Sequence, residues 1–413
     1  MSVPLEEQVS QVLLNLQGYS VEGIEKVLYG IQEQIHVHLH STKPTMCPNC
    51  HQLLPIYDTR QRYIYHASIL GKPVILVLKL RRTNCPRCGV KTERQDIAEG
   101  KKRHSKLLER TILDYTVNLD NKSTAKLLGY SVSSVYRIDR DGLEKLDKDL
   151  AERIPSLGII GLDEVSYERN HHYATVMTNQ DEARIVDIQI GKSKESALTL
   201  FRKHNNKFTW LNCVTMDFSQ SYISAVSEYF SSAYIVFDKF HFSQYVNRVM
   251  EKIRRDIQRE LPDDLKYKSK KHSRWLVLRR ECNMNQGHKA RLEQLKEDNA
   301  ELFEAYLIKE ELLSIFDVDI DTTSAEVSLH NWCRMALNSA FKPFHRLAKS
   351  IHNRMHLLLH WFRTHVTNAR AEALNNVIKS LLKRAYGYKD FEYFRLKVLQ
   401  RCGYLMKQLT HQC

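Results

Sequence analysis

The sequence predicts an α/β protein whose mixed sheet is preceded by a small cysteine-bounded β domain and a short helical domain. Three observations predict this class. Residues 157–240 read as three strands followed by alternating helices and strands, the pattern of a mixed sheet. Two Cys-x-x-Cys pairs bracket a β-rich stretch within residues 45–98. Within residues 104–150, a helix of small residues is followed by a glycine and a serine-capped second helix.

The charge of the chain favours a polyanionic partner. The 413 residues include 62 Lys and Arg against 48 Asp and Glu, a net charge of +14. Residues 248–291 alone carry 14 basic and 6 acidic residues, so part of the excess is clustered. Scattered solvated charge is the alternative interpretation of a basic chain, and clustering argues against it.

Composition also indicates the cellular compartment of the protein. No apolar run reaches the roughly 18 residues that a membrane span requires. The N-terminus lacks a basic stretch followed by an apolar core, so we expect no secretion signal, no membrane and a cytoplasmic protein. Disulfides are rare in that compartment, and the nine cysteines are expected to be reduced or metal-bound.

The first element along the chain, residues 1–44, is expected to be a helical N-terminal arm. Apolar and polar residues alternate in a helical manner from Leu5 to Leu16 and again from Val21 to Ile31. We read no chemistry from this arm.

Residues 45–98 are predicted to form a zinc ribbon. Its four candidate ligands are Cys47, Cys50, Cys85 and Cys88. Four thiolates suit one tetrahedral structural Zn²⁺, and a hairpin between the pairs, with a turn at Gly71, accounts for the long spacer. A redox Cys-x-x-Cys would need a βαβ context, which is absent, and free buried cysteines are the remaining alternative.

Residues 104–150 are predicted to form a helix-turn-helix domain. Its helices are expected at Leu107–Asn118, Ser123–Leu128 and Val132–Leu146, with Gly129 ending the second and Ser131 capping the third. Val132, Val135 and Tyr136 are expected to pack inward. The residues then left to face a DNA major groove are Ser133, Ser134, Arg137 and Arg140. An ordinary helical hairpin is the alternative.

Three acidic residues stand at the ends or on the faces of separate elements of the remaining chain. Asp163 ends the apolar run 157–162, and Asp217 ends the run 210–216. Glu372 lies on a helix expected from Asn368 to Arg384. Hard divalent cations prefer such oxygen ligands, and two cations together can clamp an in-line displacement at phosphorus. Each carboxylate alone could equally be a cap or a surface ion pair.

Two further features complete this part of the chain. A helical insertion over 241–366 explains the long gap between Asp217 and Glu372, and residues 367–413 are expected to hold the Glu helix and the C-terminal helices. Asp238 is a fourth strand-end carboxylate and a rival of Asp217 for the second metal position, whereas Glu164 and Glu168 are interpreted as caps or ion pairs.

The ordered set of motifs resembles a bacterial insertion-sequence DDE transposase of the ISL-three family. The matching segments are Gly161-Leu162-Asp163-Glu164, the stretch from Met216 to Tyr222, Asp238-Lys239-Phe240-His241, the stretch from Asn368 to Lys379, and Lys383-Arg384-Ala385-Tyr386-Gly387-Tyr388. The resemblance covers nearly the whole chain. It departs at Asn179, where an acidic residue is common, and at Ala369 and Ala373, where glycine is common.

The resemblance implies a ribonuclease-H-like core over 157–240 and a catalytic triad of Asp163, Asp217 and Glu372. The triad would hold two Mg²⁺ (or Mn²⁺) for cleavage and strand transfer. The partners implied are double-stranded DNA, as terminal inverted repeats and target, and further copies of the chain on that DNA, in the nucleoid. Lys379, Lys383, Arg384 and the basic block 248–291 are expected to contact phosphates.

Two other functions remain open at this point. A non-catalytic, domesticated DNA-binding regulator would use the zinc ribbon, the helix-turn-helix and the basic charge equally well. A nuclease acting on branched DNA or on RNA hybrids would share the metal chemistry. Only the acidic triad separates an enzyme from the regulator.

Overall fold

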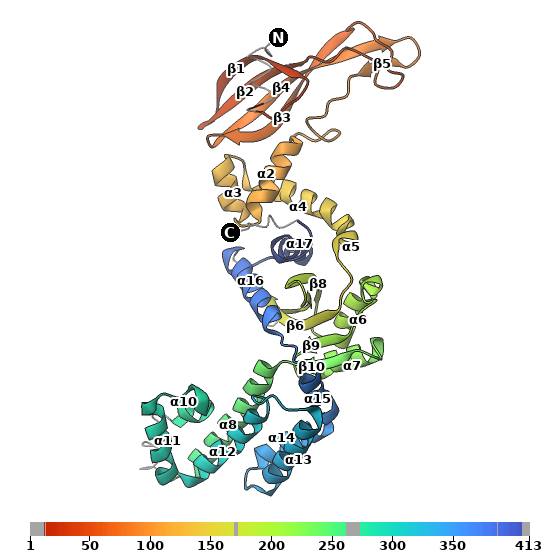
Figure 1. The fold of residues 1–413 in the computed structure, drawn as a ribbon. Helices are drawn as coiled ribbons and strands as arrows, with labels where there is room; N and C mark the ends of the chain where they lie inside the picture. The colour runs from red at the N-terminus through yellow and green to blue at the C-terminus, as the bar shows by residue number, and fades with distance from the viewer. Residues whose placement is uncertain (1–11, 13, 169–171, 262–272, 386, 407–413) are drawn as a thin grey trace. The chain divides into compact units, whose positions relative to one another are not determined.

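The computed structural model describes residue 12 and residues 14–168, 172–261, 273–385 and 387–406. The chain divides into two compact units. The first comprises residues 1–153, 384–401 and 405–413, and the second comprises residues 154–383 and 402–404. Figure 1 shows the elements of both along the chain.

The first unit begins with a five-stranded sheet. Its strands are β1 (Tyr19–Tyr29), β2 (Gln32–Ser41), β3 (Asp58–Ile69), β4 (Lys72–Cys85) and β5 (Gly89–Thr92). They lie in the order β1-β2-β4-β3, and β5 pairs with β4. The hairpin expected between the cysteine pairs is confirmed as β3 and β4.

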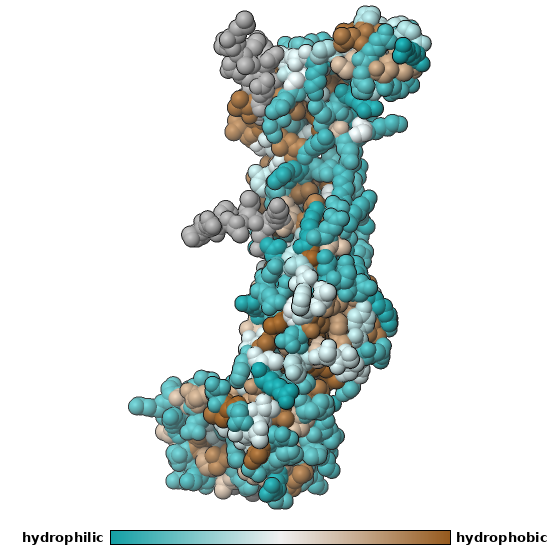
Figure 2. Space-filling model, turned by 45° about the vertical axis from the view of Figure 1, so that its right-hand side comes forward, coloured by the Kyte–Doolittle hydropathy of each residue, from teal (hydrophilic) through white to brown (hydrophobic). Residues whose placement is uncertain are grey.

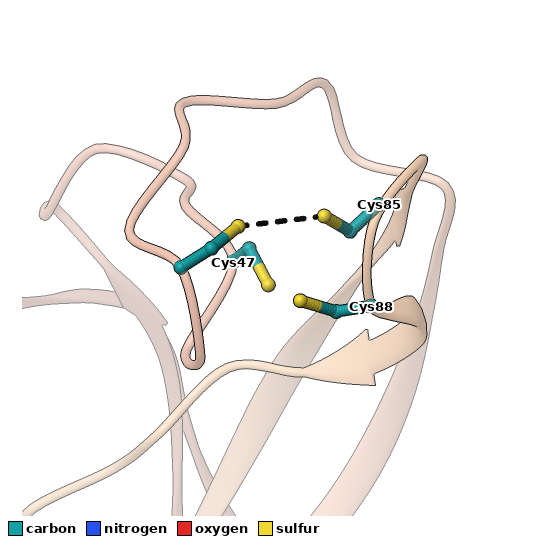
Figure 3. Close-up of side chains that lie close together, drawn as sticks. Cys47, Cys85 and Cys88 are labelled. Carbon is teal, nitrogen blue, oxygen red and sulfur yellow. Dashed lines mark hydrogen bonds between the residues drawn. The ribbon is translucent and has the colours of Figure 1, made fainter.

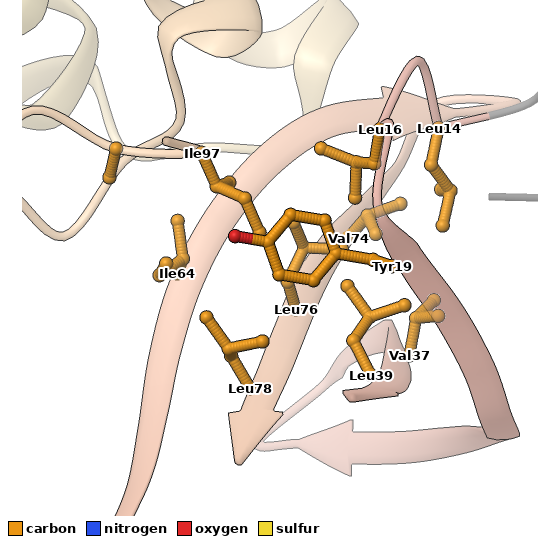
Figure 4. Packing of buried hydrophobic residues seen from close by; sticks show 11 residues of the cluster. Leu14, Leu16, Tyr19, Val37, Leu39, Ile64, Val74, Leu76, Leu78 and Ile97 are labelled. Atoms are coloured by element: carbon orange, nitrogen blue, oxygen red, sulfur yellow. The ribbon is translucent and has the colours of Figure 1, made fainter. Parts of the chain in front are cut away.

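The expectation of a helical arm over residues 1–44 is wrong for residues 19–41, which form an antiparallel hairpin. The decisive signal is a period of two, because Ile35, Val37 and Leu39 alternate with histidines. Val37 and Leu39 are buried in a core with Tyr19 that also takes residues from β3 and β4 (Figure 4). These residues therefore belong to the β domain. Most of the expected helix from Leu5 to Leu16 lies outside the described residues.

Three helices follow in the first unit, with ends within two residues of those that the sequence predicts. They are α2 (Lys106–Thr116), α3 (Asn121–Leu128) and α4 (Val132–Lys148), followed by the short α5 (Leu150–Arg153). Gly129 ends α3 at a φ of 72°, and the Ser131 side chain accepts a hydrogen bond from the Ser134 amide at the start of α4. A Cβ at position 129 would lie 2.9 Å from the carbonyl oxygen of Gly71, so this turn requires glycine.

The C-terminal helix α17 (Phe391–Cys402) contributes most of its length to the first unit, where it packs on α2 and α4. The contact is polar and buried. Lys397 Nζ lies 3.2 Å from Asp139 Oδ2, and the Tyr393 hydroxyl donates to the same oxygen at 2.5 Å. Because a buried charge without a partner costs several kcal/mol, this network fixes α17 against the helical domain.

The second unit is built on a mixed five-stranded sheet. Its strands are β6 (Ile159–Glu168), β7 (His172–Asn179), β8 (Arg184–Ile190), β9 (Cys213–Met216) and β10 (Tyr234–Phe237), in the order β10-β9-β6-β7-β8. The first three strands form an antiparallel meander, and β9 and β10 join it in parallel. This order, 3-2-1-4-5 counted from the first strand, is the ribonuclease-H arrangement, with α6 (Lys194–Lys203) and α7 (Gln220–Tyr229) as connections.

The rest of the second unit is helical. After α8 (Lys239–Glu260) come α10 (Ser273–Leu278), α11 (Gln286–Asp298), α12 (Ala300–Ile315), α13 (Thr322–Asn338), α14 (Lys342–Asn353), α15 (Met355–Thr364) and α16 (Ala369–Ala385). The expected insertion and the expected Glu helix are therefore both present. No helix within the described ranges is long and apolar enough to cross a membrane. Hydrophilic residues cover most of the face shown in Figure 2.

Candidate active site

The sheet register brings Asp163 and Asp217 together. β6 and β9 run parallel, and their last paired residues are Leu162 and Met216. Asp163 is the next residue of β6, and Asp217 directly follows the last residue of β9, so both carboxylates lie at the same end of this parallel pairing. β6 itself continues to Glu168, so the expectation that Asp163 ends its strand is wrong. The geometry follows from the strands, since parallel neighbours present their carboxyl ends on one side.

Asp163 is buried and held from two sides. Its Oδ1 accepts the backbone amide of Glu164 at 2.7 Å, and its Oδ2 accepts Asn375 Nδ2 from α16 at 2.6 Å. Only 7% of the residue is exposed, and this burial raises the pKa of Asp163. The two hydrogen bonds thus fix the orientation of the carboxylate. Its burial removes most of its hydration.

Asp217 has a neighbour that the sequence analysis missed. His241 Nε2, on α8, lies 3.1 Å from Asp217 Oδ1. Ligand atoms of Asp163, Asp217 and His241 all lie within 4.8 Å of one another. Although Asp217 Oδ1 is buried, no hydrogen-bond donor with good geometry reaches it among the described residues. A buried oxygen without a donor, beside a second carboxylate and an imidazole, fits a divalent cation.

The raised pKa of Asp217 beside Asp163 also favours a bound cation. Burial raises the pKa of Asp217 to about 7, while His241 lowers it and the nearby Asp163 raises it further. Two carboxylates this close and this poorly hydrated do not both ionise readily without a cation. A divalent cation held between the two carboxylates would offset this repulsion.

Asp238 does not join this cluster. It is the N-cap of α8, where its Oδ1 accepts the amides of Phe240 at 2.6 Å and His241 at 3.4 Å. These hydrogen bonds satisfy the first turn of the helix that carries His241. Asp238 thus orients α8.

Helix α16 is anchored to the sheet by Asn368. Its Oδ1 accepts Thr215 Oγ1 at 2.8 Å and Gln180 Nε2 at 3.2 Å. A Cβ at Gly161 would lie 2.1 Å from Gln180 Nε2 and 3.0 Å from Asn368 Oδ1, so glycine is needed for this close approach. Asn375, two turns further on, then reaches Asp163.

Glu372 is not brought into the cluster. It is exposed in the first turn of α16, three residues before Asn375, a spacing that puts the two Cβ atoms about 5–6 Å apart. Lys379 and Lys383 are exposed further along the helix. Arg384 belongs to the first unit, where its guanidinium donates to the carbonyl of Asn118.

A cavity of about 460 Å³ opens over the two aspartates. His241 and Glu164 also line it, and basic groups surround the acidic centre: Lys192, Arg248 and Arg354. Lys192 Nζ lies 3.6 Å from Glu164, which has 41% of its side chain exposed, in accord with its interpretation as an ion-pair residue. A negative centre inside a positive rim suits an anionic chain that approaches bound cations.

The four cysteines lie together at the ends of two knuckles in the first unit (Figure 3). All four sulfur atoms are within 4.8 Å of one another, and Cys50 Sγ lies 3.5 Å from Cys85 Sγ. Tetrahedral zinc with Zn–S bonds of about 2.3 Å requires sulfurs roughly 3.8 Å apart. Backbone amides of Cys50 and Asn49 lower the pKa of the Cys47 thiol to about 6, which favours the thiolate. The donor set fits one structural Zn²⁺.

The four residues of α4 that are expected to face DNA differ in solvent exposure and in their hydrogen bonds and ion pairs. Ser133 and Arg137 are exposed, whereas Ser134 is half-buried and hydrogen-bonds Ser131. Arg140 is ion-paired with Glu144 at 2.8 Å and with Asp390 at 2.6 Å.

The inward packing expected for Val132 is wrong, because 48% of it is exposed. Val135 is buried, as expected, while Tyr136 is half-buried and packs edge-on against Tyr393.

Two family models match the chain. A model described as a transposase, of the ISL-three DDE type, covers residues 160–398. A model described as the zinc-finger of transposase IS204/IS1001/IS1096/IS1165 covers residues 43–88. The chain belongs to the ISL-three family of transposases. The first match includes both aspartates, His241 and Glu372, and the second includes all four cysteines.

Individual relatives of this transposase are distant in sequence. It is 25% identical over 400 residues to the transposase for insertion sequence element IS1001 of Bordetella parapertussis, covering 95% of this chain and 98% of that protein. It is 21% identical over 341 residues to the transposase for IS1557 of Mycobacterium tuberculosis, covering 77% and 76%. Among solved structures, a Drosophila P element transposase strand transfer complex matches 72% of this chain and 93% of its own at 9% identity and a TM-score of 0.42.

His241 and Asn375 are the residues that sequence reasoning missed. His241 stands three residues after the strand-end Asp238, so a cap followed by a histidine in the first helical turn was a usable signal. Asn375 stands one turn after Glu372 on the same side of α16. The spacing of polar residues along that helix face is the signal in the sequence for Asn375.

Proposed function

We propose that this transposase cleaves DNA at the ends of its element and joins the freed 3′ ends to target DNA, in a reaction that depends on Mg²⁺ or Mn²⁺. The observation that carries the proposal is a pair of neighbouring carboxylates at one edge of the sheet, the buried Asp163 and the half-buried Asp217, which follow the last paired residues of two parallel strands. Asp217 Oδ1 has no hydrogen-bond donor among the described residues, and the ligand atoms converge with His241.

Each residue has a defined part in the proposed site. Asp163 and Asp217 would hold the cations, which would supply activation of the attacking oxygen and stabilisation of the leaving one. Asn375 keeps Asp163 oriented. Glu372, one turn before Asn375, supplies the third carboxylate by rotating its exposed side chain toward the same cavity. His241 Nε2, 3.1 Å from Asp217 Oδ1, adds a nitrogen ligand atom beside the two carboxylates.

DNA recognition is assigned to the first unit. The exposed residues of α4, led by Ser133 and Arg137, read the terminal inverted repeat in the major groove, and the zinc-bound knuckles stabilise the neighbouring β domain. Because an element has two ends, at least two copies act together on the DNA in the nucleoid. Lys379 and Lys383 contact the phosphate backbone.

The test compares three carboxylate variants with a matched control on a duplex that carries one end of the element. Asp163→Asn, Asp217→Asn and Glu372→Gln each keep the side-chain shape and remove the charge. We expect each to abolish cleavage and strand joining in Mn²⁺ while repeat binding persists. Glu326→Gln, an exposed helical glutamate outside the site, should cleave normally.

One observation favours a second function, a DNA-binding regulator without catalysis. Glu372 lies outside the carboxylate cluster. If the wild-type protein binds repeat ends but cleaves none of them in Mg²⁺ or Mn²⁺, the regulator replaces the enzyme. If only Glu372→Gln remains active, the third carboxylate must be sought elsewhere in the cavity, beginning with Glu164.

A further inference from the structure

One face of α8 carries a row of basic and aromatic side chains that begins at the candidate active site. The row comprises His241, Tyr245, Arg248, Lys252, Arg255 and Arg259. Their spacing alternates between four and three residues, which keeps all six on one side of a helix. The opposite face is apolar and buried, with Val246, Met250 and Ile253. The helix is therefore oriented with the basic row outward.

The row lines two cavities that meet at Arg248. His241, Tyr245 and Arg248 line the cavity over the aspartates. Arg248 also lines a second cavity of about 670 Å³, whose wall includes Lys252, Arg255 and Arg259 of α8 and Arg274 of α10. We call this second cavity the α8 groove. Basic residues on one face of α8 thus line both cavities, although Glu251 and Asp256 also contribute to the wall of the α8 groove.

The charges of the α8 groove are only partly neutralised. Glu251 pairs with Arg254, Arg255 and Arg274 at 2.7–3.7 Å. Arg259 lies 3.4 Å from Asp256. Within the part of the chain that the structure describes, neither Arg248 nor Lys252 has an acidic partner, and both are exposed. These two cations are free to bind a ligand at no cost in broken ion pairs.

We propose that the α8 groove holds the phosphate backbone of the duplex DNA that extends from the phosphodiester at Asp163 and Asp217. Arg248 and Lys252 are its principal contacts. This inference rests on the proposed function, because it takes the scissile phosphate to lie at the aspartates. It narrows the expected DNA contacts of the basic block 248–291 to one helix face.

The helix geometry sets the register of the contact. At 1.5 Å per residue, Arg248 lies about 10 Å and Lys252 about 16 Å along α8 from His241. One strand of duplex DNA advances about 3.4 Å per nucleotide. Arg248 should therefore meet the backbone about three nucleotides from the scissile bond, and Lys252 about five.

The first experiment measures DNA affinity as a function of salt, with full-length protein carrying Asp163→Asn so that binding is read without cleavage. Each phosphate contact contributes about −0.9 to the slope of log K against log salt. Arg248→Ala with Lys252→Ala should reduce the steepness by about 1.8 and weaken binding by up to about sixtyfold at ~0.1 M salt. Arg334→Ala with Lys342→Ala removes the same charge from exposed sites on α13 and α14 and should change neither value.

A third pair, Lys289→Ala with Arg291→Ala, lies in the basic block but outside the α8 groove. An equal loss of slope in this pair would mean diffuse attraction to the whole block and would overturn the proposal. An unchanged slope in the Arg248 and Lys252 variant would overturn it as well. Circular dichroism verifies that every variant is folded.

The second experiment determines which phosphate of the duplex lies next to residue 252. Lys252→Cys is crosslinked to duplexes that carry a thiol-reactive group on single phosphates, and reaction should peak about five nucleotides from the scissile bond. A flat profile argues against the groove. The outcomes are separable from those of the proposed function, which is judged by cleavage in the protein with an intact triad. Absent cleavage with a retained salt effect would remove the enzyme and leave the groove as a DNA site.

Discussion

Replacing Asp217 by asparagine should stabilise the metal-free protein at high pH, although it destroys the candidate cation site. Burial raises the pKa of Asp217 from an ordinary value of 3.8 to about 7. Between these two values the folded protein keeps a proton that the unfolded chain has lost. Stability therefore falls as the pH rises from about 4 to about 7, and the full penalty is present above pH 7.

The size of the effect follows from the shift. About three pKa units at roughly 1.36 kcal/mol each give a ceiling of about 4 kcal/mol. Asp217 has 29% of its side chain exposed and shares its titration with Asp163, so solvent and coupling reduce this figure. We expect Asp217→Asn to gain about 1–3 kcal/mol at pH 8 and almost nothing at pH 4.

Intrinsic fluorescence is suited to this measurement. All four tryptophans, Trp210, Trp275, Trp332 and Trp361, lie in the second unit, so urea unfolding followed by their emission reports on the unit that holds the site. Titrations in EDTA at pH 8 and pH 4 give the difference. Adding Mn²⁺ at about 100 times its dissociation constant should then stabilise the wild type by about 2.7 kcal/mol and the variant by nothing.

Two outcomes would refute this reasoning. A variant that is less stable than wild type by the same amount at both pH values would show that Asp217 stabilises the fold through contacts, not that it is a strained carboxylate. Equal stabilisation of both proteins by Mn²⁺ would place the cation elsewhere. Asp238→Ala is the control, since loss of the α8 cap should cost about 0.5–2 kcal/mol and leave the response to Mn²⁺ intact.

Three other predictions concern separate parts of the chain. Gly161→Ala should cost about 1–3 kcal/mol by the same fluorescence assay, because the new Cβ would lie 2.1 Å from Gln180 Nε2; a loss below about 0.5 kcal/mol would mean that this junction is not tightly packed. Metal analysis should return about one zinc per chain, and protein that binds repeat DNA specifically without zinc would contradict the structural role of the four thiolates. Arg137→Ala should relax base preference in competition binding, whereas Arg140→Ala should mainly lower the thermal stability of the first unit, since Arg140 is held by Glu144 and Asp390. If Arg140→Ala alone alters base preference, the groove-facing side of α4 has been misassigned.

Local signals account for what the sequence predicted well. Gly129 and Ser131 define the turn between α3 and α4 by backbone conformation and capping, which depend on residues only three or four positions apart. The hairpin of β3 and β4 likewise follows from alternation around one turn. The N-terminal hairpin follows the same rule, because Ile35, Val37 and Leu39 show the period of a strand, and this period outweighs the apparent helical period of the residues before them.

The sequence by itself determined the two knuckles, the caps and the apolar runs that precede Asp163 and Asp217, because each depends on neighbours along the chain. Only the tertiary structure decided which of these groups meet. The pairing of Leu162 with Met216 sets the two aspartates side by side, and α8 and α16 then add His241 and Asn375 and leave Glu372 outside the cluster. Such contacts join residues that are 24 to more than 200 positions apart, and they depend on strand register and helix packing, which no local pattern encodes.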